Sequence, residues 1–239
     1  MNTDALGPSS PTLKSVVKNY AYATLWPAAR LLGRRVYPPP RASEIALTFD
    51  DGPNPACTPR LLDLLASNNV RASFFLVGRF AQADPALVRR ISAEGHVIGN
   101  HTWSHPNLAH IPAAHVLQEL KQTSDALEQV TGKPIRLFRP PFGAANRTAL
   151  ATARGLGMVP VFWNAMTADW ESRPAAQIAD ELKQQITRNE GRKRATCLVL
   201  HDRKADAPDA CCDASVDAAA RLIVQYQGRS QFVTIDSWL

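Results

Sequence analysis

The sequence lacks the features that mark several large classes of protein. It has four cysteines in 239 residues and no Cys-x-x-Cys pair, which argues against a disulfide framework. No stretch approaches the about 18 consecutive apolar residues of a membrane-spanning helix. The formal charge of +6 is spread along the chain and comes with no basic helix or aromatic stacking platform, so no nucleic-acid partner is expected.

The few cysteines support only limited predictions. Cys197 falls in an apolar run, Cys197 to Leu200, and is expected to be a small core residue. Cys211 and Cys212 are adjacent in a polar loop. An exposed thiol pair, a vicinal disulfide and a site for a soft metal are all compatible with that position.

The start of the chain is expected to form a separate segment. Residues 1–42 are interpreted as an N-terminal extension and linker with a helix over 11–34, and residues 43–239 as the main folded domain. No clean secretion signal is recognised, which favours a cytoplasmic location. The protein is expected to be a monomer. A periplasmic or membrane-associated location is the alternative, with membrane contact through the basic, aromatic residues 11–35.

From residue 43 onward, apolar runs of strand length alternate with helical patterns. Residues 112–130 give the longest helix, with one apolar face that ends before Gly132 and Pro134. Repeated strand–helix units imply a parallel sheet, closed or doubly wound. Seven strands are predicted, at residues 45–49, 72–77, 96–99, 135–138, 158–163, 197–200 and 232–235.

Polar residues follow almost every predicted strand. In parallel α/β folds, functional groups gather at the carboxyl ends of the strands. This clustering is the main argument from the residues alone for an active site. The groups in question are Asp50 and Asp51, His101 and His105, Arg139 with the turn Pro140 to Gly143, Asp169 with Trp170, and His201.

Two of these groups suggest a cation. Asp50 and Asp51 end a buried strand, where two ionised carboxylates repel each other unless a cation is near. His101 and His105, four residues apart, can face one metal from a single helical turn. A turn or cap for the aspartates and a surface pair for the histidines are the simpler alternatives.

Taken in order, these residues resemble the polysaccharide deacetylases of carbohydrate esterase family 4, the NodB-homology domain. The resemblance covers most of the chain, from Ile45 onward, and extends past the first motif through Asn54 to Pro59. It rests on five motifs: Thr48-Phe49-Asp50-Asp51-Gly52-Pro53, His101-Thr102-Trp103-Ser104-His105, Arg139-Pro140-Pro141-Phe142-Gly143, Asp169-Trp170, and Leu198-Val199-Leu200-His201.

The resemblance implies a distorted (β/α)7 TIM-like barrel and a role for each motif residue. Asp51, His101 and His105 would bind one divalent metal, with Zn2+ expected and Co2+, Ni2+ or Fe2+ as alternatives. Asp50 would be the general base, held ionised and oriented by Arg139. The remaining implied roles are the oxyanion N–H near Phe142, the general acid His201 tuned by Asp169, and the acetyl pocket walls Trp170 and Leu200.

The sequence departs from the family pattern at three positions. Phe142 stands where Tyr is usual, Arg203 where Gly is common after the last motif, and Asn164 where Asp is frequent. These changes bear on substrate fit more than on the reaction.

Two hypotheses of different classes follow. The first is a metal-dependent hydrolase that removes N-acetyl groups from an N-acetylglucosamine-containing oligosaccharide or polysaccharide, of the chitooligosaccharide or peptidoglycan type, with a glycolipid or a non-sugar amide as variant substrates. The second is a carbohydrate-binding domain without turnover. Loss of a metal ligand or of Asp50 would mark the second, and all of these residues are present.

Overall fold

The structure, a computed structural model, describes residues 38–39, 41–207 and 212–239. Its strands pair in parallel throughout one sheet. Seven of them follow the order β5-β4-β3-β2-β1-β7-β6, and β8 pairs with β1 off this path. The strands are β1 (Glu44–Asp50), β2 (Ser73–Leu76), β3 (Val97–Asn100), β4 (Leu137–Phe138), β5 (Val159–Pro160), β6 (Ala165–Met166), β7 (Thr196–His201) and β8 (Gln231–Phe232).

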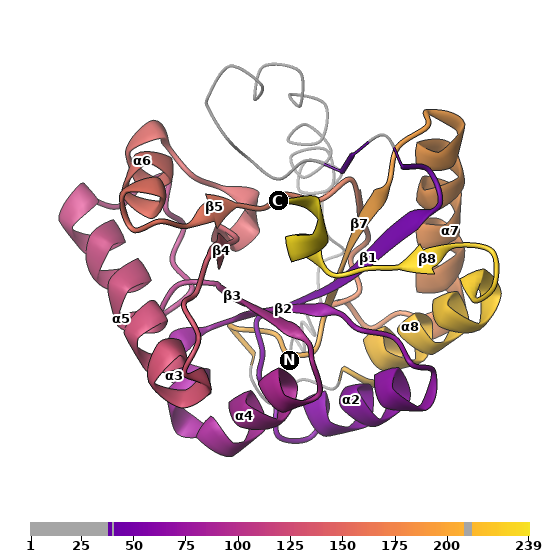
Figure 1. Ribbon diagram of the computed structural model, residues 1–239, viewed down its shortest axis with the longest axis horizontal. Helices are drawn as coiled ribbons and strands as arrows, with labels where there is room; N and C mark the ends of the chain where they lie inside the picture. Colours follow the sequence, from indigo (N-terminus) through magenta and orange to yellow (C-terminus); the bar gives the residue numbers. More distant parts are fainter. Residues whose placement is uncertain (1–37, 40, 208–211) are drawn as a thin grey trace, which may run out of the picture. The chain divides into compact units, whose positions relative to one another are not determined.

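Helices cover the outer face of this curved sheet (Figure 1). Local signals fix several of their ends. Asp84 accepts the N–H of Leu87 at 3.0 Å and caps α4, while Gly132 ends α5 in the left-handed region at φ 66°. The α-helices are α2 (Thr58–Ser67), α3 (Gly78–Ala83), α4 (Pro85–Ala93), α5 (Ala113–Thr131), α6 (Arg147–Gly155), α7 (Ala175–Gly191) and α8 (Asp213–Tyr226), and the 3-10 helices are η2 (Pro141–Gly143) and η3 (Ile235–Trp238).

The predicted distorted (β/α)7 barrel is confirmed, with seven strands on the main path of the sheet. The strands at the two ends of that path, β5 and β6, are not paired with each other among the described residues, so the barrel is open on that side. The helical extension that was expected at the N-terminus, and the expected cysteine neighbour Cys211, lie outside the described residues.

Two of the predicted strands differ in the structure. The strand expected at 158–163 is shortened to β5, which pairs with β4, and β6, which follows it and pairs with β7, was not predicted. Pro160 ends β5 and supplies no N–H for further pairing. The strand expected at 232–235 is reduced to β8 and continues as η3, and the short helix α3 was not predicted.

The main apolar core lies between the sheet and the helices. It combines strand residues such as Leu47 and Leu200 with helix residues such as Leu61, Ile178 and Leu222. Cys197 is fully buried with a free thiol, as expected for a core residue. Cys212 forms a disulfide with Cys57, across a Cα–Cα distance of 6.3 Å, which the sequence analysis did not foresee.

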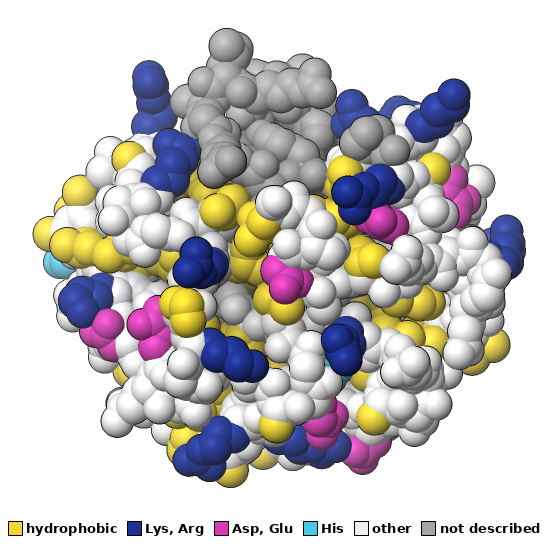
Figure 2. All heavy atoms as spheres, viewed as in Figure 1, with side chains coloured by type: hydrophobic (Ala, Val, Ile, Leu, Met, Phe, Trp, Pro, Cys, Tyr) yellow, Lys and Arg dark blue, Asp and Glu magenta, His cyan; other side chains and the backbone are white. Residues whose placement is uncertain are grey.

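In the described part of the chain, no helix has the length and apolar character needed to cross a membrane. On the face seen in Figure 2, Lys and Arg side chains are dispersed among Asp and Glu. No single basic patch dominates that face, in line with the scattered charge of the sequence.

Candidate active site

The register of β1 and β7 brings two of the predicted site residues together. The two strands run parallel, with Ile45 opposite Thr196 at one end and Asp50 opposite His201 at the other. Asp50 and His201 therefore lie side by side at the carboxyl ends of their strands. Neighbouring strands are about 4.8 Å apart. Backbone hydrogen bonding therefore sets the separation of Asp50 and His201.

The buried side chain of Arg139 orients the carboxylate of Asp50. Its Nη1 donates to Oδ1 of Asp50 at 2.6 Å and to the hydroxyl of Thr48 at 2.7 Å. The guanidinium is fully buried and lies over the ring of Phe75, 4.0 Å from its centre. A buried Arg needs a carboxylate partner, and Asp50 supplies it.

Asp51, His101 and His105 converge on one point. Oδ1 of Asp51 lies 3.2 Å from Nε2 of His101 and 3.0 Å from Nε2 of His105. One ligand atom from each residue falls within 4.8 Å of the others. Asp51 and His105 adopt left-handed backbone conformations, at φ 72° and 65°, which turn these side chains toward each other just beyond β1 and β3.

The protonation of His101 indicates what this point accommodates. Its Nδ1 lies 2.8 Å from the carbonyl oxygen of Arg139, and since a carbonyl only accepts, Nδ1 carries the proton. In the neutral ring the lone pair of Nε2 then faces a carboxylate oxygen. Oδ1 of Asp51 is buried and has no hydrogen-bond donor in the described part of the chain. These facing lone pairs fit a divalent cation.

The ionised state of the Asp51 carboxylate also suits the binding of a divalent cation. Burial alone would raise the pKa of Asp51, but His101, His105 and His201 in their protonated forms more than offset it, so this pKa lies well below its usual value. A divalent cation would favour the ionised carboxylate in the same way when the rings of His101 and His105 are neutral. Oδ2 of Asp51 accepts the N–H of Ala205 at 3.0 Å, which fixes the carboxylate plane.

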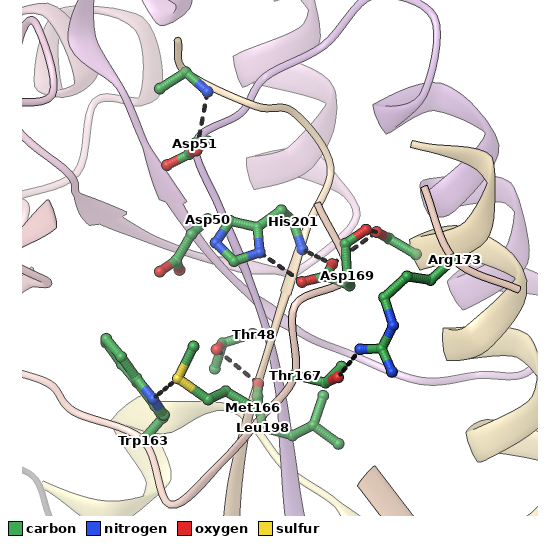
Figure 3. A network of polar contacts seen from close by, with 12 residues as sticks. Thr48, Asp50, Asp51, Trp163, Met166, Thr167, Asp169, Arg173, Leu198 and His201 are labelled. Atoms are coloured by element: carbon green, nitrogen blue, oxygen red, sulfur yellow. Dashed lines mark hydrogen bonds and ion pairs between the residues drawn. The ribbon is translucent and has the colours of Figure 1, made fainter. Parts of the chain in front are cut away.

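His201 is held by Asp169. Its Nδ1 lies 2.8 Å from Oδ1 of Asp169, whose Oδ2 accepts the His201 N–H and the hydroxyl of Ser215, each at 2.7 Å. In Figure 3 the ring of His201 stands between Asp169 and Asp50. Burial favours the neutral ring, but the Asp169 carboxylate outweighs it, with smaller contributions from Asp51 and Asp50, and raises the pKa of His201 to about 10.

The three residues expected to form the substrate pocket differ in placement. Phe142 is 60% exposed, has φ 59° and packs edge-on against His105 with ring centres 4.7 Å apart. Trp170 packs edge-on against His201 at 5.1 Å. The structure does not bring Leu200 to this site: it is fully buried in the core, because consecutive strand residues point to opposite faces and Leu200 precedes His201.

Four contributors were missed by sequence reasoning. Thr48 binds Arg139, and its place in the first motif was the signal that could have found it. Ser215, at the start of α8, donates a hydrogen bond to Asp169. Asp202 is buried: its Oδ2 accepts the hydroxyl of Thr58, and its carboxylate packs against Gly52. Glu119 of α5 contacts the His101–His105 turn. Asp202 directly follows His201 at a strand end, which was a signal for it, whereas nothing local in the sequence marks Ser215 or Glu119.

The strand ends of this parallel barrel thus carry an Arg139–Asp50 pair, a His201–Asp169 pair and an Asp–His–His group, an arrangement typical of a hydrolase. The sequence matches the family model for polysaccharide deacetylase over residues 38–161. The chain belongs to the polysaccharide deacetylases, carbohydrate esterase family 4.

Individual relatives agree with this assignment. The peptidoglycan-N-acetylglucosamine deacetylase of Bacillus cereus is 34% identical over 238 residues, 99% of this chain and 78% of the relative. The chitooligosaccharide deacetylase of Azorhizobium caulinodans is 34% identical over 67% of this chain and 74% of its own. A crystal structure of a peptidoglycan N-acetylglucosamine deacetylase, in complex with 4-naphthalen-1-yl-N-oxidanyl-benzamide, has a TM-score of 0.72 at 34% identity, covering 84% of this chain and 90% of the other.

Proposed function

We propose that the protein is a metal-dependent deacetylase that hydrolyses the N-acetyl groups of an N-acetylglucosamine-containing glycan. One observation carries the proposal: the Asp51–His101–His105 group lies beside two separately held proton-transfer residues, Asp50 and His201. The names of the relatives, deacetylases of peptidoglycan and of chitooligosaccharides, support this substrate class.

Asp51, His101 and His105 would hold the metal. Two imidazole nitrogens and one carboxylate oxygen suit Zn2+, with Co2+, Ni2+ and Fe2+ as the alternatives to test. When bound, a divalent metal polarises the amide carbonyl and favours ionisation of water near neutral pH.

The residues of the chain supply the proton transfers. Asp50, oriented by Arg139, accepts the proton of the attacking water. His201, kept charged by Asp169, donates a proton to the departing nitrogen, and each transfer is worth about 10²–10⁴ in rate. The main-chain N–H of Phe142 donates to the oxygen that gains charge, and the indole of Trp170 borders the acetyl methyl.

The test is acetate release from N-acetylglucosamine oligomers and from peptidoglycan, with added Zn2+, with chelator and with Asp50→Asn. Chelator is expected to abolish activity, and Asp50→Asn to lower kcat by about 10² or more while Zn2+ stays bound. Asp63→Asn is the matched control, because Asp63 pairs with Arg90 on the surface. Glycan binding without acetate release, unchanged by Asp50→Asn, would favour a binding domain instead.

The site of action is a separate proposal. Disulfides persist in oxidising compartments, and the Cys57–Cys212 bridge therefore supports the periplasmic alternative over a cytoplasmic location. Fractionation of cells that produce the native protein tests this. Recovery of the protein from the cytosol with both thiols reduced would contradict it.

A further inference from the structure

The turn that carries His101 and His105 is held from outside by helix α5. Oε2 of Glu119 accepts the N–H of Trp103 and the N–H of Ser104, both at 2.8 Å. Oε1 accepts the hydroxyl of Ser104 at 2.7 Å. All three contacts of this carboxylate thus go to residues that lie between the two histidines.

The backbone of this turn needs such support. Thr102 and His105 adopt left-handed conformations, at φ 69° and 65°, which side chains other than glycine adopt rarely. The chain has left β3 here, so no neighbouring strand takes the N–H groups of Trp103 and Ser104 in a ladder. Hydrogen bonds from backbone N–H to a charged carboxylate are stronger than those between neutral groups, and Glu119 provides two of them.

A second side chain ties the same turn to α5. Oδ1 of Asn100 accepts the N–H of Thr102 at 2.8 Å, and Nδ2 of Asn100 donates to the carbonyl of Leu120 at 2.8 Å. The turn is therefore fixed at both of its ends relative to one rigid helix. A long helix packed on the sheet is a stiffer support than a loop.

We propose that Glu119 is a positioning residue for the metal group: its carboxylate holds the turn so that Nε2 of His101 and Nε2 of His105 converge on Oδ1 of Asp51. The inference rests on the proposed function, since it assigns a supporting residue to that site. Outer contacts that orient metal ligands typically contribute 10–100-fold to metal affinity. Glu119 touches none of the ligands directly and acts through the backbone between them.

The same helix provides a matched control. Oε1 of Glu128 accepts the N–H of Ile135 at 2.8 Å, in the segment that leads to β4. Glu128→Ala removes the same kind of contact from the same helix, away from the histidine turn. A merely structural role predicts equal effects for the two substitutions, and a positioning role predicts different ones.

The experiment compares wild type, Glu119→Ala, Glu119→Gln and Glu128→Ala. Zn2+ affinity is measured by competition with a chromophoric chelator, and ligand geometry by the visible spectrum of the Co2+-loaded protein. Glu119→Ala is expected to weaken Zn2+ binding by about 10–100-fold and to alter the Co2+ spectrum. Glu119→Gln keeps one acceptor oxygen and should recover part of the affinity, while Glu128→Ala should leave affinity and spectrum unchanged.

The inference would be overturned if folded Glu119→Ala kept the Zn2+ affinity and the Co2+ spectrum of the wild type. It would also be overturned if Glu128→Ala lost as much Zn2+ affinity as Glu119→Ala. If circular dichroism shows that Glu119→Ala does not fold, Glu119→Gln and Ser104→Ala decide by the same two measurements. Wild type that binds no Zn2+ would contradict the proposed function itself. These outcomes separate failure of the positioning role from failure of the metal site.

Discussion

At the scale of the residue, Arg139 connects the two halves of the site. Its guanidinium binds Asp50, while its own carbonyl oxygen accepts the Nδ1 proton of His101. The side chain thus serves the proposed base and the main chain serves a proposed metal ligand. Substitution of the side chain can separate the two contributions.

Arg139→Lys is expected to lower kcat by about 10² or more, because the shorter lysine lacks the planar guanidinium that stacks on Phe75 and so fixes Nη1 between Asp50 and Thr48. Zn2+ affinity should stay close to wild type, since the carbonyl that orients His101 is retained. Steady-state kinetics and chelator competition on the same sample provide the check. Loss of metal together with activity would show that the two halves cannot be separated.

The substitution Asp169→Asn tests whether His201 is the general acid. The Asp169 carboxylate raises the pKa of His201 to about 10, so its removal lowers that pKa. As the proposed acid, His201 acts in its charged form, and activity is therefore expected to fall as pH rises through its pKa. The alkaline limb of the kcat/KM profile is expected to move to lower pH in Asp169→Asn. A bound dication lowers the pKa of His201 in both proteins, so the comparison is made at saturating metal. An unmoved limb would contradict the assignment of His201 as the acid.

Single residues also show what the sequence could and could not predict. The motifs identified Asp51, His101, His105, Asp50 and Arg139, all of which the structure brings together, because short motifs at strand ends carry their own geometry. Leu200 was placed by motif membership, and strand alternation turns it into the core. Strand alternation could have been applied before the structure was known.

At the scale of the element, the segments that follow β1 and β7 approach so closely that only glycine fits at residue 52. A Cβ on Gly52 would lie 2.4 Å from Oδ1 of Asp202. The carboxyl group of Asp202 is fully buried, and this burial raises its pKa to about 7. The segment after the aspartate pair is therefore packed directly on the residue after His201.

Gly52→Ala is expected to destabilise the fold by about 1–3 kcal/mol, through this overlap with Asp202. Asp202→Ala removes the overlapping atoms, so the double variant Gly52→Ala, Asp202→Ala should be more stable than the sum of the two single changes predicts. Urea unfolding of the four proteins measures the coupling. Additive effects would show that the two segments relax independently.

The elements differ in how far they could be predicted. Helix α5 was expected within a residue or so of its observed ends, because a long amphipathic pattern stops at Gly132. The strand expected at 158–163 is shorter than predicted and the following β6 was missed, since pairing with the distant β4 and β7 decides which residues become strand. Helix α3 is only six residues long and gives too short a periodic signal to detect.

At the scale of the whole molecule, the Cys57–Cys212 disulfide joins the segment after β1 to the start of α8, 155 residues further along the chain. No spacing rule predicts a pairing across such a distance. A cross-link of this kind restricts the unfolded chain strongly, because it closes a long loop.

Reduction of this bridge, or Cys57→Ser, is expected to lower the free energy of unfolding by about 2–4 kcal/mol. Urea denaturation with and without reductant measures the change. Cys197→Ala serves as the control: its thiol is free, so the variant should keep the full response to reductant. Equal stability of the wild type in both conditions would show that the bridge does not form in solution.

The register of β1 against β7 has a consequence for how such an enzyme changes over time. Asp50 and His201 are opposite each other on hydrogen-bonded strands, whereas Phe142 and Trp170 lie in short segments beyond strand ends. A lineage can therefore replace or lengthen these two segments, and so exchange one sugar polymer for another, while the gap between the two proposed proton-transfer residues is inherited unchanged.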